Sequence, residues 1–276
     1  MGLRINTNIE AFNAHRSLEN TSNSIAKSMQ RLSSGFRINT AGDDAAGLGI
    51  SERMRAQISG LDQATRNSQD GISMVQTAEG ALQEFQSILH RVRDLAVQWN
   101  NGTNDAGAKS AIASEVTQLS AELSRMIGVA SFNGIPLLST NTVANPILAT
   151  LQVGANNGEI LTISSVNVNN VIGLGVQNFI NATVGQYIDI NSFDAMINTF
   201  SNLRSNFGAI QNRLEHTINA LGIYSENLQS AESRIRDVDM AAEMTNFTKL
   251  QVLQQSGTAM LAQANQSTAS VLSLLK

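Results

Sequence analysis

The sequence predicts a mainly α-helical fold in which long antiparallel helices are accompanied by a terminal coiled coil and a small β-hairpin region. Apolar residues recur every three or four positions through most of the 276 residues, as they do on one face of a helix. Short turn-forming clusters separate these stretches, which favours antiparallel neighbours. Only residues 126–188 differ, because they hold both prolines and a single charged residue, Glu159.

The C-terminal third, residues 192–275, carries the longest apolar stripe. The residues on it repeat at steps of seven and then of three or four: Leu214, Leu221, Leu228, Ile235, Met240, Met244, Phe247, Leu250, Leu253, Gly257, Met260 and Ala264. This spacing is close to the heptad period of a coiled coil. Residues 250–275 contain no charged side chain. Because so apolar a surface is rarely left in water, we expect it to pack against another helix, in this chain or in a neighbouring copy.

A first helix is predicted over residues 6–33. Three apolar residues lie seven positions apart on it: Leu18, Ile25 and Leu32. Asn6 or Thr7 is expected to cap its start, and Gly35 suits a left-handed conformation after its end. The two ends of the chain are thus both amphipathic helices, which can pair with each other.

Residues 37–49 are irregular and contain the acidic pair Asp43 and Asp44. We interpret this pair as a turn and a helix cap, because the spacing lacks the further ligands of a calcium loop. Residues 45–99 then predict one long helix or two nearly continuous ones. Its second half has a regular apolar stripe: Ile72, Val75, Ala78, Leu82, Phe85, Leu89, Val92, Ala96 and Trp99.

A turn cluster at residues 100–104 leads to a further helix over residues 106–128. The apolar face of that helix consists of Ile112, Val116, Leu119, Leu123 and Met126. Residues 151–153 and 160–163, joined by a glycine-rich turn, predict a β-hairpin. A third short strand is expected over residues 166–171, and the long C-terminal helices begin at Phe193.

Composition and charge exclude several classes of function. The net charge of -4 and the pI near 5.4 argue against a nucleic-acid partner, which usually needs a basic patch. The chain has no cysteine, and its three histidines (His15, His90 and His216) fall in separate helical segments, so we expect neither a metal site nor a cofactor. No spacing singles out a catalytic triad, so we do not expect an enzyme.

Residues 1–10 lack the apolar run of a secretory signal, which taken alone would suggest the cytoplasm. Residues 250–275 are long enough to span a membrane, but amides interrupt them: Gln251, Gln254, Gln255, Gln263, Asn265 and Gln266. Because these amides are costly in a bilayer, we expect no membrane insertion.

Several longer motifs are more specific. Towards the N-terminus they are Arg31–Asn39, Asp43–Leu48, Asn67–Leu82 and Phe132–Gly134 with Leu137–Leu138. Towards the C-terminus they are Gly208–Leu214, Glu226–Leu228, Ser233–Met240 and Leu261–Gln266. Together they resemble the terminal signatures of bacterial flagellin, and they cover nearly the whole chain at both ends. The variable outer domains of that family are missing or reduced to residues 126–188.

The resemblance implies a structural subunit that self-assembles into the extracellular flagellar filament for swimming. Residues 1–45 and 236–276 would pair as the coiled coil of the inner tube. Residues 46–235 would form the surrounding helical layer, with a β-hairpin region near residues 140–190. The expected assembly seam consists of Leu18, Ile25, Leu32, Leu250, Leu253, Met260 and Leu261.

The same resemblance implies partners. These are further copies of the chain, the flagellar export apparatus, an export chaperone, and the hook-junction and cap proteins. Export would proceed through the flagellum's own channel without a cleaved signal, so the protein would be secreted. Thr268 stands near the position where flagellins usually carry a proline, so the terminal helix is expected to run on without a bend.

Charged residues cluster where the two predicted layers meet. The candidates for register or switching contacts are Arg31, Asp43, Arg234, Arg236 and Asp237. They are either solvated pairs, worth about 0–1 kcal/mol each, or contacts between subunits. The second interpretation is favoured by their position at the point where coiled-coil pairing must begin or end.

The segment around residue 90 also has two interpretations. It is either an ordinary exposed helix face with an Arg91–Asp94 pair, or a surface that a Toll-like innate immune receptor binds in many flagellins. The resemblance assigns the second role to Arg91, Leu95 and Glu115, with Leu95 exposed as a contact residue, while His90 replaces the usual glutamine.

Three alternatives stand beside the filament subunit: a soluble helical binding or signalling module, an enzyme, and a hook–filament junction protein. A signalling coiled coil should keep charged flanking positions, which residues 250–275 lack. The enzyme lacks a site, and the junction protein shares only the similarity of the ends.

Overall fold

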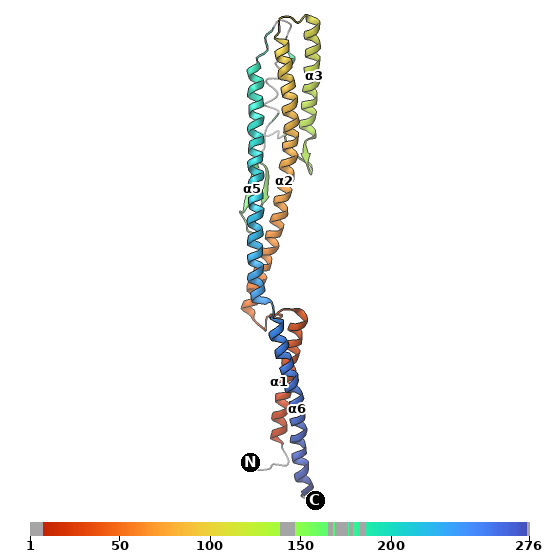
Figure 1. Cartoon of the computed structure of the whole chain (residues 1–276), viewed down its shortest axis with the longest axis vertical. Coiled ribbons are helices and arrows are strands. Elements are labelled where there is room, and N and C mark those ends of the chain that lie inside the picture. Colours follow the sequence, from red (N-terminus) through yellow and green to blue (C-terminus); the bar gives the residue numbers. More distant parts are fainter. Residues whose placement is uncertain are drawn as a thin grey trace. The chain divides into compact units, whose positions relative to one another are not determined.

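The computed structural model describes residues 8–138, 147–164, 168, 176, 179–182 and 186–274. The chain divides into two compact units. We call Met1–Ala56 together with Asn227–Lys276 the terminal unit, and Gln57–Glu226 the central unit. The elements of the described residues are five long α-helices and two antiparallel two-stranded sheets (Figure 1), which confirms the predicted mainly α-helical class.

The terminal unit is built on two antiparallel helices, α1 (Ile9–Ser34) and α6 (Met240–Leu274), which lie side by side (Figure 1). At one end of the pair, Nδ2 of Asn8 donates a hydrogen bond to the carbonyl oxygen of Ala264 at 2.9 Å. At the other end, Phe36 forms an antiparallel backbone bridge with Asp237. The prediction that the two ends of the chain pair with each other is therefore confirmed.

Both ends of α1 are capped. The side chain of Asn8 accepts the backbone N–H of Ala11 at 3.0 Å, so Asn8 is the cap, and the predicted candidates Asn6 and Thr7 lie outside the described residues. Gly35 follows the helix with φ of 75° and donates its N–H to a carbonyl of the last turn. A left-handed conformation of this kind costs a glycine little, so this part of the prediction is confirmed.

The least exposed positions of α1 and α6 repeat at alternating steps of three and four, which is the seam of a coiled coil. In α1 they are Ala11, Ala14, Leu18, Thr21, Ile25, Ser28 and Leu32. In α6 they are Glu243, Phe247, Leu250, Gln254, Gly257, Leu261 and Ala264. We call these residues the α1–α6 seam.

Five of the seven predicted seam residues lie in the α1–α6 seam: Leu18, Ile25, Leu32, Leu250 and Leu261. Leu253 and Met260 lie outside it, with 46% and 64% of their surface exposed. The reason is that α6 is apolar on more than one side. A stripe through Leu253 and Met260 has the same period as the one that faces α1, and spacing alone does not choose between them.

In the central unit, residues from Gln57 onwards of α2 (Ala45–Trp99) are joined by α3 (Ala106–Val129) and by the part of α5 (Ile190–Arg236) up to Glu226. Helix α2 is continuous over its 55 residues. Side-chain contacts between α2 and α5 follow an antiparallel order, as shown by Asp62 with Ser225, Glu79 with Arg204, and Arg93 with Asp194. The first of these joins the two ends of the central unit, since the Ser225 hydroxyl donates to Asp62 Oδ1 at 3.5 Å.

The core of the central unit contains the predicted stripe of α2. All of its residues are buried except Ile72, which is partly buried against the others. The rings of Phe85 and Phe200 stack with centroids 5.9 Å apart, and Trp99 meets Phe179 edge-on at 5.7 Å. Nε1 of Trp99 donates to the carbonyl of Gln186 at 3.0 Å, so its only polar atom is paired.

Strands β3 (Ile147–Gln152) and β4 (Ile160–Ser164) form the predicted hairpin, and Nδ2 of Asn67 on α2 donates to the carbonyl of Gln152 at 3.0 Å. Of the third strand predicted over residues 166–171, only Val168 is described, and it is helical and buried. Strands β1 (Ser131–Phe132) and β2 (Ile135–Pro136) form a second, smaller hairpin that the sequence analysis did not predict.

Candidate assembly surface

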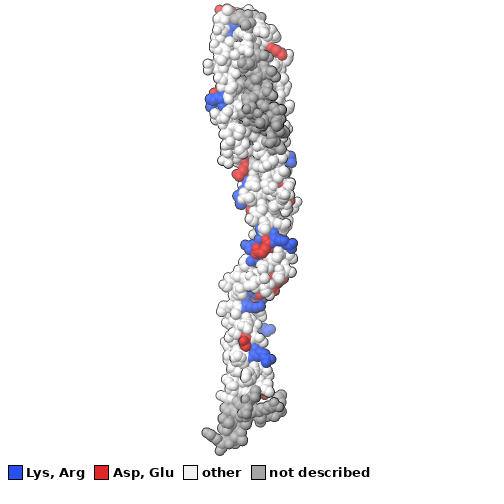
Figure 2. Space-filling model, turned by 180° about the vertical axis from the view of Figure 1, so that it is seen from behind, with Lys and Arg blue, Asp and Glu red and all other residues white. Residues whose placement is uncertain are grey.

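Pairing of α1 with α6 covers only one side of each helix. Large apolar residues remain exposed on the outer sides of the pair: Ile9, Phe12, Met29, Met240, Met244, Val252, Leu253 and Met260. Figure 2 shows that uncharged residues cover most of the visible face of both units. A surface with this much apolar area usually marks a site of association.

A groove of about 740 Å³ follows one side of the α1–α6 pair. Leu18 and Gly257 form part of its floor, and Leu253 and Met260 line its α6 side. A Cβ atom at Gly257 would lie 3.3 Å from Cδ1 of Leu18, so the absence of a side chain there allows the close approach of the two helices. The groove has the shape and the apolar lining to accept side chains from a further helix.

Two backbone segments are hydrogen-bonded to each other at one end of the α1–α6 pair. We call residues 35–38 and 236–238 the clasp. The N–H of Arg37 donates to the carbonyl of Arg236 at 2.6 Å, and the N–H of Val238 donates to the carbonyl of Gly35 at 3.0 Å. Because these groups lie about 200 positions apart in sequence, the clasp ties the start of the chain to its end.

Arg236 is the main side chain of the clasp, with 13% of its side chain exposed. Its Nη1 lies 2.7 Å from Oε1 of Glu52, and its guanidinium carbon lies 4.8 Å from the ring centroid of Phe36. Asp237 accepts the Ser233 hydroxyl at 2.6 Å. Arg234 is exposed and donates to Ser230 one turn earlier in α5.

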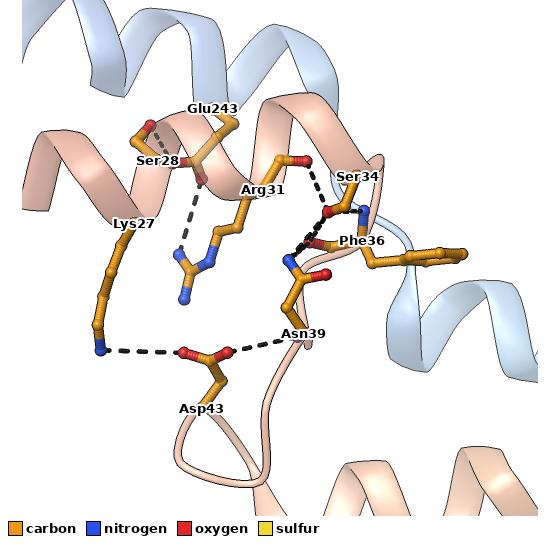
Figure 3. Close-up of polar contacts among 8 residues, drawn as sticks. All are labelled: Lys27, Ser28, Arg31, Ser34, Phe36, Asn39, Asp43 and Glu243. Atoms are coloured by element: carbon orange, nitrogen blue, oxygen red, sulfur yellow. Dashed lines mark hydrogen bonds and ion pairs between the residues drawn. The ribbon is translucent and has the colours of Figure 1, made fainter.

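Arg31 and Asp43, the other two predicted register residues, lie in a polar network beside the clasp (Figure 3). Nη1 of Arg31 is 3.8 Å from Oε2 of Glu243, which also accepts the hydroxyl of Ser28 through its other oxygen. Nζ of Lys27 is 3.8 Å from Oδ1 of Asp43. Each of the five predicted register residues contacts another residue of the terminal unit.

The acidic pair has the predicted structural roles. Oδ2 of Asp43 accepts the backbone N–H groups of Asn39 and Thr40 at 3.3 and 3.1 Å, and the Thr40 hydroxyl at 3.0 Å. Oδ1 of Asp44 accepts the N–H of Gly47 at 2.8 Å, as a cap of α2 does. The prediction of a turn and a cap is confirmed.

The backbone N–H of Thr40, and then the Thr40 hydroxyl, hold the pKa of Asp43 below its ordinary value of 3.8. The folded-state pKa therefore lies below the unfolded one, so the stabilisation is complete above pH 3.8 and is lost as the pH falls through the folded-state pKa.

We expect Asp43→Asn to lower the melting temperature of the terminal unit at neutral pH. The difference in melting temperature between this variant and the wild type should be smaller at about pH 2, where Asp43 of the wild type loses its charge. Thermal unfolding of both proteins at the two pH values tests this, and an equal gap at both would contradict it.

The three residues predicted to bind an immune receptor are only partly as expected. Nη2 of Arg91 lies 2.6 Å from Oε1 of Glu115, and both side chains are exposed. Leu95 is only 1% exposed, so its predicted role as an exposed contact is wrong. Leu95 lies one turn from Arg91, on the side of α2 where α3 packs. The apolar stripe predicts one buried side of α2, but α2 packs against neighbours on two sides, and Leu95 is on the second of them.

Sequence reasoning missed Glu243 and its partner Ser28 as seam residues. A signal was available, because Glu243, Leu250, Gly257 and Ala264 are spaced seven apart. A carboxylate at this spacing does not belong to an apolar stripe, so the apolar pattern alone does not mark Glu243 as a seam residue.

Other kinds of site receive no support from the described part of the chain. No group of three or more histidine, aspartate or glutamate residues is arranged to hold a metal ion there. None of the described helices combines the length and apolarity needed to cross a bilayer.

Comparison with known proteins identifies the family. The profiles "Bacterial flagellin N-terminal helical region" and "Bacterial flagellin C-terminal helical region" match residues 5–142 and 190–275. The chain is 52% identical over 277 residues to a flagellin of Halalkalibacterium halodurans, covering 99% of both. It is 46% identical over 285 residues to the flagellar filament 33 kDa core protein of Treponema phagedenis, covering 99% of both. It is 45% identical over 304 residues to a flagellin of Bacillus subtilis, covering 99% of this chain and 100% of that one. The chain therefore belongs to the bacterial flagellin family.

Proposed function

We propose that the chain is a structural subunit that polymerises into the extracellular bacterial flagellar filament. The observation that carries this function is the apolar outer surface that remains on the α1–α6 pair after the two helices have covered each other. Flagellins are structural proteins, so no reaction is assigned. Swimming motility is the physiological role that follows from a filament of this family.

The terminal segments 1–45 and 236–276 form the inner layer of the filament, and residues 46–235 form the layer around it. The support for this arrangement is the distribution of apolar surface. The central unit buries the rings of Phe85, Trp99 and Phe200 in a core of its own, whereas the α1–α6 pair leaves Phe12 and Met260 exposed. Contacts between different patches on successive copies build an open helical polymer when the rotation from one copy to the next does not close a ring.

Before assembly the subunit passes through the flagellar export apparatus with an export chaperone, and at the growing end it meets the hook-junction and cap proteins. Family membership is what supports these partners. The cysteine-free sequence is compatible with the route, because no disulfide can obstruct an unfolded chain. Arg31, Asp43, Arg234, Arg236 and Asp237 set the register between subunits in this proposal, in addition to their contacts within the chain.

Seeded assembly tests the proposal. Purified monomer is added to sheared fragments of filament, and growth is followed by electron microscopy. Elongation that consumes the soluble chain supports a filament subunit. A chain that stays soluble and fully folded beside competent seeds would reject it and favour the helical binding module.

We also propose that a Toll-like receptor binds the surface around Arg91 and Glu115, a role supported by the exposed ion pair between them. Arg91→Ala is expected to weaken receptor signalling by the monomer. Its stability should change by only about 0.2–1 kcal/mol, the usual contribution of an exposed ion pair. A reporter-cell assay beside a urea unfolding curve separates the two effects, and unaltered signalling would remove the receptor from the proposal.

A further inference from the structure

We propose that Glu243 makes α6 specific for α1, so that α6 neither pairs with another α6 nor slips along α1. The inference concerns the choice of helix partner within the terminal unit, and it does not depend on the filament that the chain builds.

The position of Glu243 is the first observation. It occupies a seam position of α6, and only 12% of its side chain is exposed. Ser28, which is 2% exposed, donates its hydroxyl to one carboxylate oxygen, and Arg31 lies 3.8 Å from the other (Figure 3). The carboxylate is therefore covered by α1 and supplied with a donor and a cation by α1.

The other residues of the α6 seam distinguish poorly between one partner helix and another. The next positions at the same spacing are Leu250, Gly257 and Ala264, and residues 250–275 carry no charge at all. Lys249 is the only other charged residue in α6, and it is exposed. Small and apolar seam residues pack about equally well against many helix faces, so they provide affinity but little specificity.

Wrong pairings leave Glu243 without its partners. A slip of one heptad moves α6 by about 10 Å along α1. It brings Thr21 opposite the carboxylate and puts Ser24 where Arg31 was, so the cation is lost. Pairing with a second α6 offers neither Ser28 nor Arg31. Because a carboxylate buried without donor and cation is costly, these arrangements are disfavoured.

The clasp does not make this choice by itself. The two hydrogen bonds of its bridge join backbone groups of Gly35, Arg37, Arg236 and Val238, so they do not depend on a side chain of α6. It fixes where α6 starts once it has formed. Glu243 lies on the face of α6 that pairs, so it can favour the correct partner helix and register before the clasp has formed. It can do the same when helices of two different chains meet.

Cysteine cross-linking in the unpolymerised full-length chain tests the proposal, because the natural sequence has no cysteine. Leu18→Cys with Gly257→Cys reports the correct register, since the two residues are in contact. Leu18→Cys with Leu250→Cys reports a slip of one heptad. Leu250→Cys alone reports pairing between two α6 helices as a covalent dimer, because Leu250 lies in the α6 seam.

Only the first cross-link is expected while Glu243 is present. Glu243→Leu should raise the slipped product, the dimer, or both by about tenfold, as loss of one charged hydrogen bond predicts. Lys249→Leu is the matched control, because it removes the other charge of α6 from an exposed position and should change none of the three yields. An unchanged pattern in Glu243→Leu would overturn the proposal.

Exchange of the charges gives a second test that does not depend on how Glu243→Leu folds. Arg31→Glu alone should lower the yield of the correct cross-link by about tenfold, because it places two carboxylates together. Adding Glu243→Arg should restore the yield. Failure of the double variant to recover would also overturn the proposal. Because every measurement is made on monomers, failure here is distinguishable from failure of seeded growth.

Discussion

A chain that ends at Arg236 is expected to add no measurable length to filament seeds under conditions in which the full chain elongates them. The truncation removes α6, and with it half of the α1–α6 seam and most of the exposed apolar residues of the pair. Helix α1 alone would be a marginal helix in water, because most of the stability of a helix comes from packing. Electron microscopy of seeds incubated with either chain measures the difference.

The control for the truncation is the central unit. Its core lies within Gln57–Glu226 and includes no residue beyond Leu221, so its thermal unfolding should be unchanged when α6 is missing. Loss of growth with an intact central unit then assigns polymerisation to the terminal unit. Seeds that elongate equally well with the truncated chain would show that the assembly surface lies elsewhere.

Leu95→Ala is expected to destabilise the central unit by about 2–5 kcal/mol, the usual cost of removing a leucine side chain from a packed core. Leu95 is 1% exposed and belongs to the cluster that joins α2, α3 and α5. A loss of this size is a large part of the stability of a typical domain. Urea unfolding followed by circular dichroism gives the free energy directly.

Val97→Ala is the matched control, since Val97 lies two residues away on the same helix and is 48% exposed. Its effect should remain within about 0.5 kcal/mol. Equal stability of the two variants would mean that Leu95 is a surface residue after all, and the receptor contact predicted from the sequence would stand again.

The sequence was sufficient for features that depend on local periodicity. The apolar stripe from Ile72 to Trp99 required a helix, and its residues form the core. The glycine-rich turn before Ile160 marked the hairpin of β3 and β4. The turn at Asn133 and Gly134, where both residues have positive φ, carries an equally good signal, because Asn-Gly is the preferred pair in a tight hairpin. It could have been predicted and was not.

Features that depend on which helix packs where could not be predicted from the sequence. The period of α6 allows a seam through Leu253 and Met260 as readily as the one through Gln254 and Leu261 that faces α1. Leu95 falls on a second buried side of α2, which becomes visible only when α3 is in position. The clasp joins backbone groups about 200 residues apart, and no local pattern encodes such a partner.

The contact between Asp62 and Ser225 has a consequence for the order of folding. Closing a flexible loop costs entropy that grows with its length, so joining Phe36 to Asp237 directly in an unfolded chain is slow and unfavourable. Once the central unit has formed, Asp62 and Ser225 at its two ends are in contact, and residues 39–61 and 226–235 connect them along the chain to the clasp. The central unit thereby works as a template that raises the effective concentration of α1 around α6. We therefore expect α1 and α6 to pair last when the chain folds and to separate first when it unfolds.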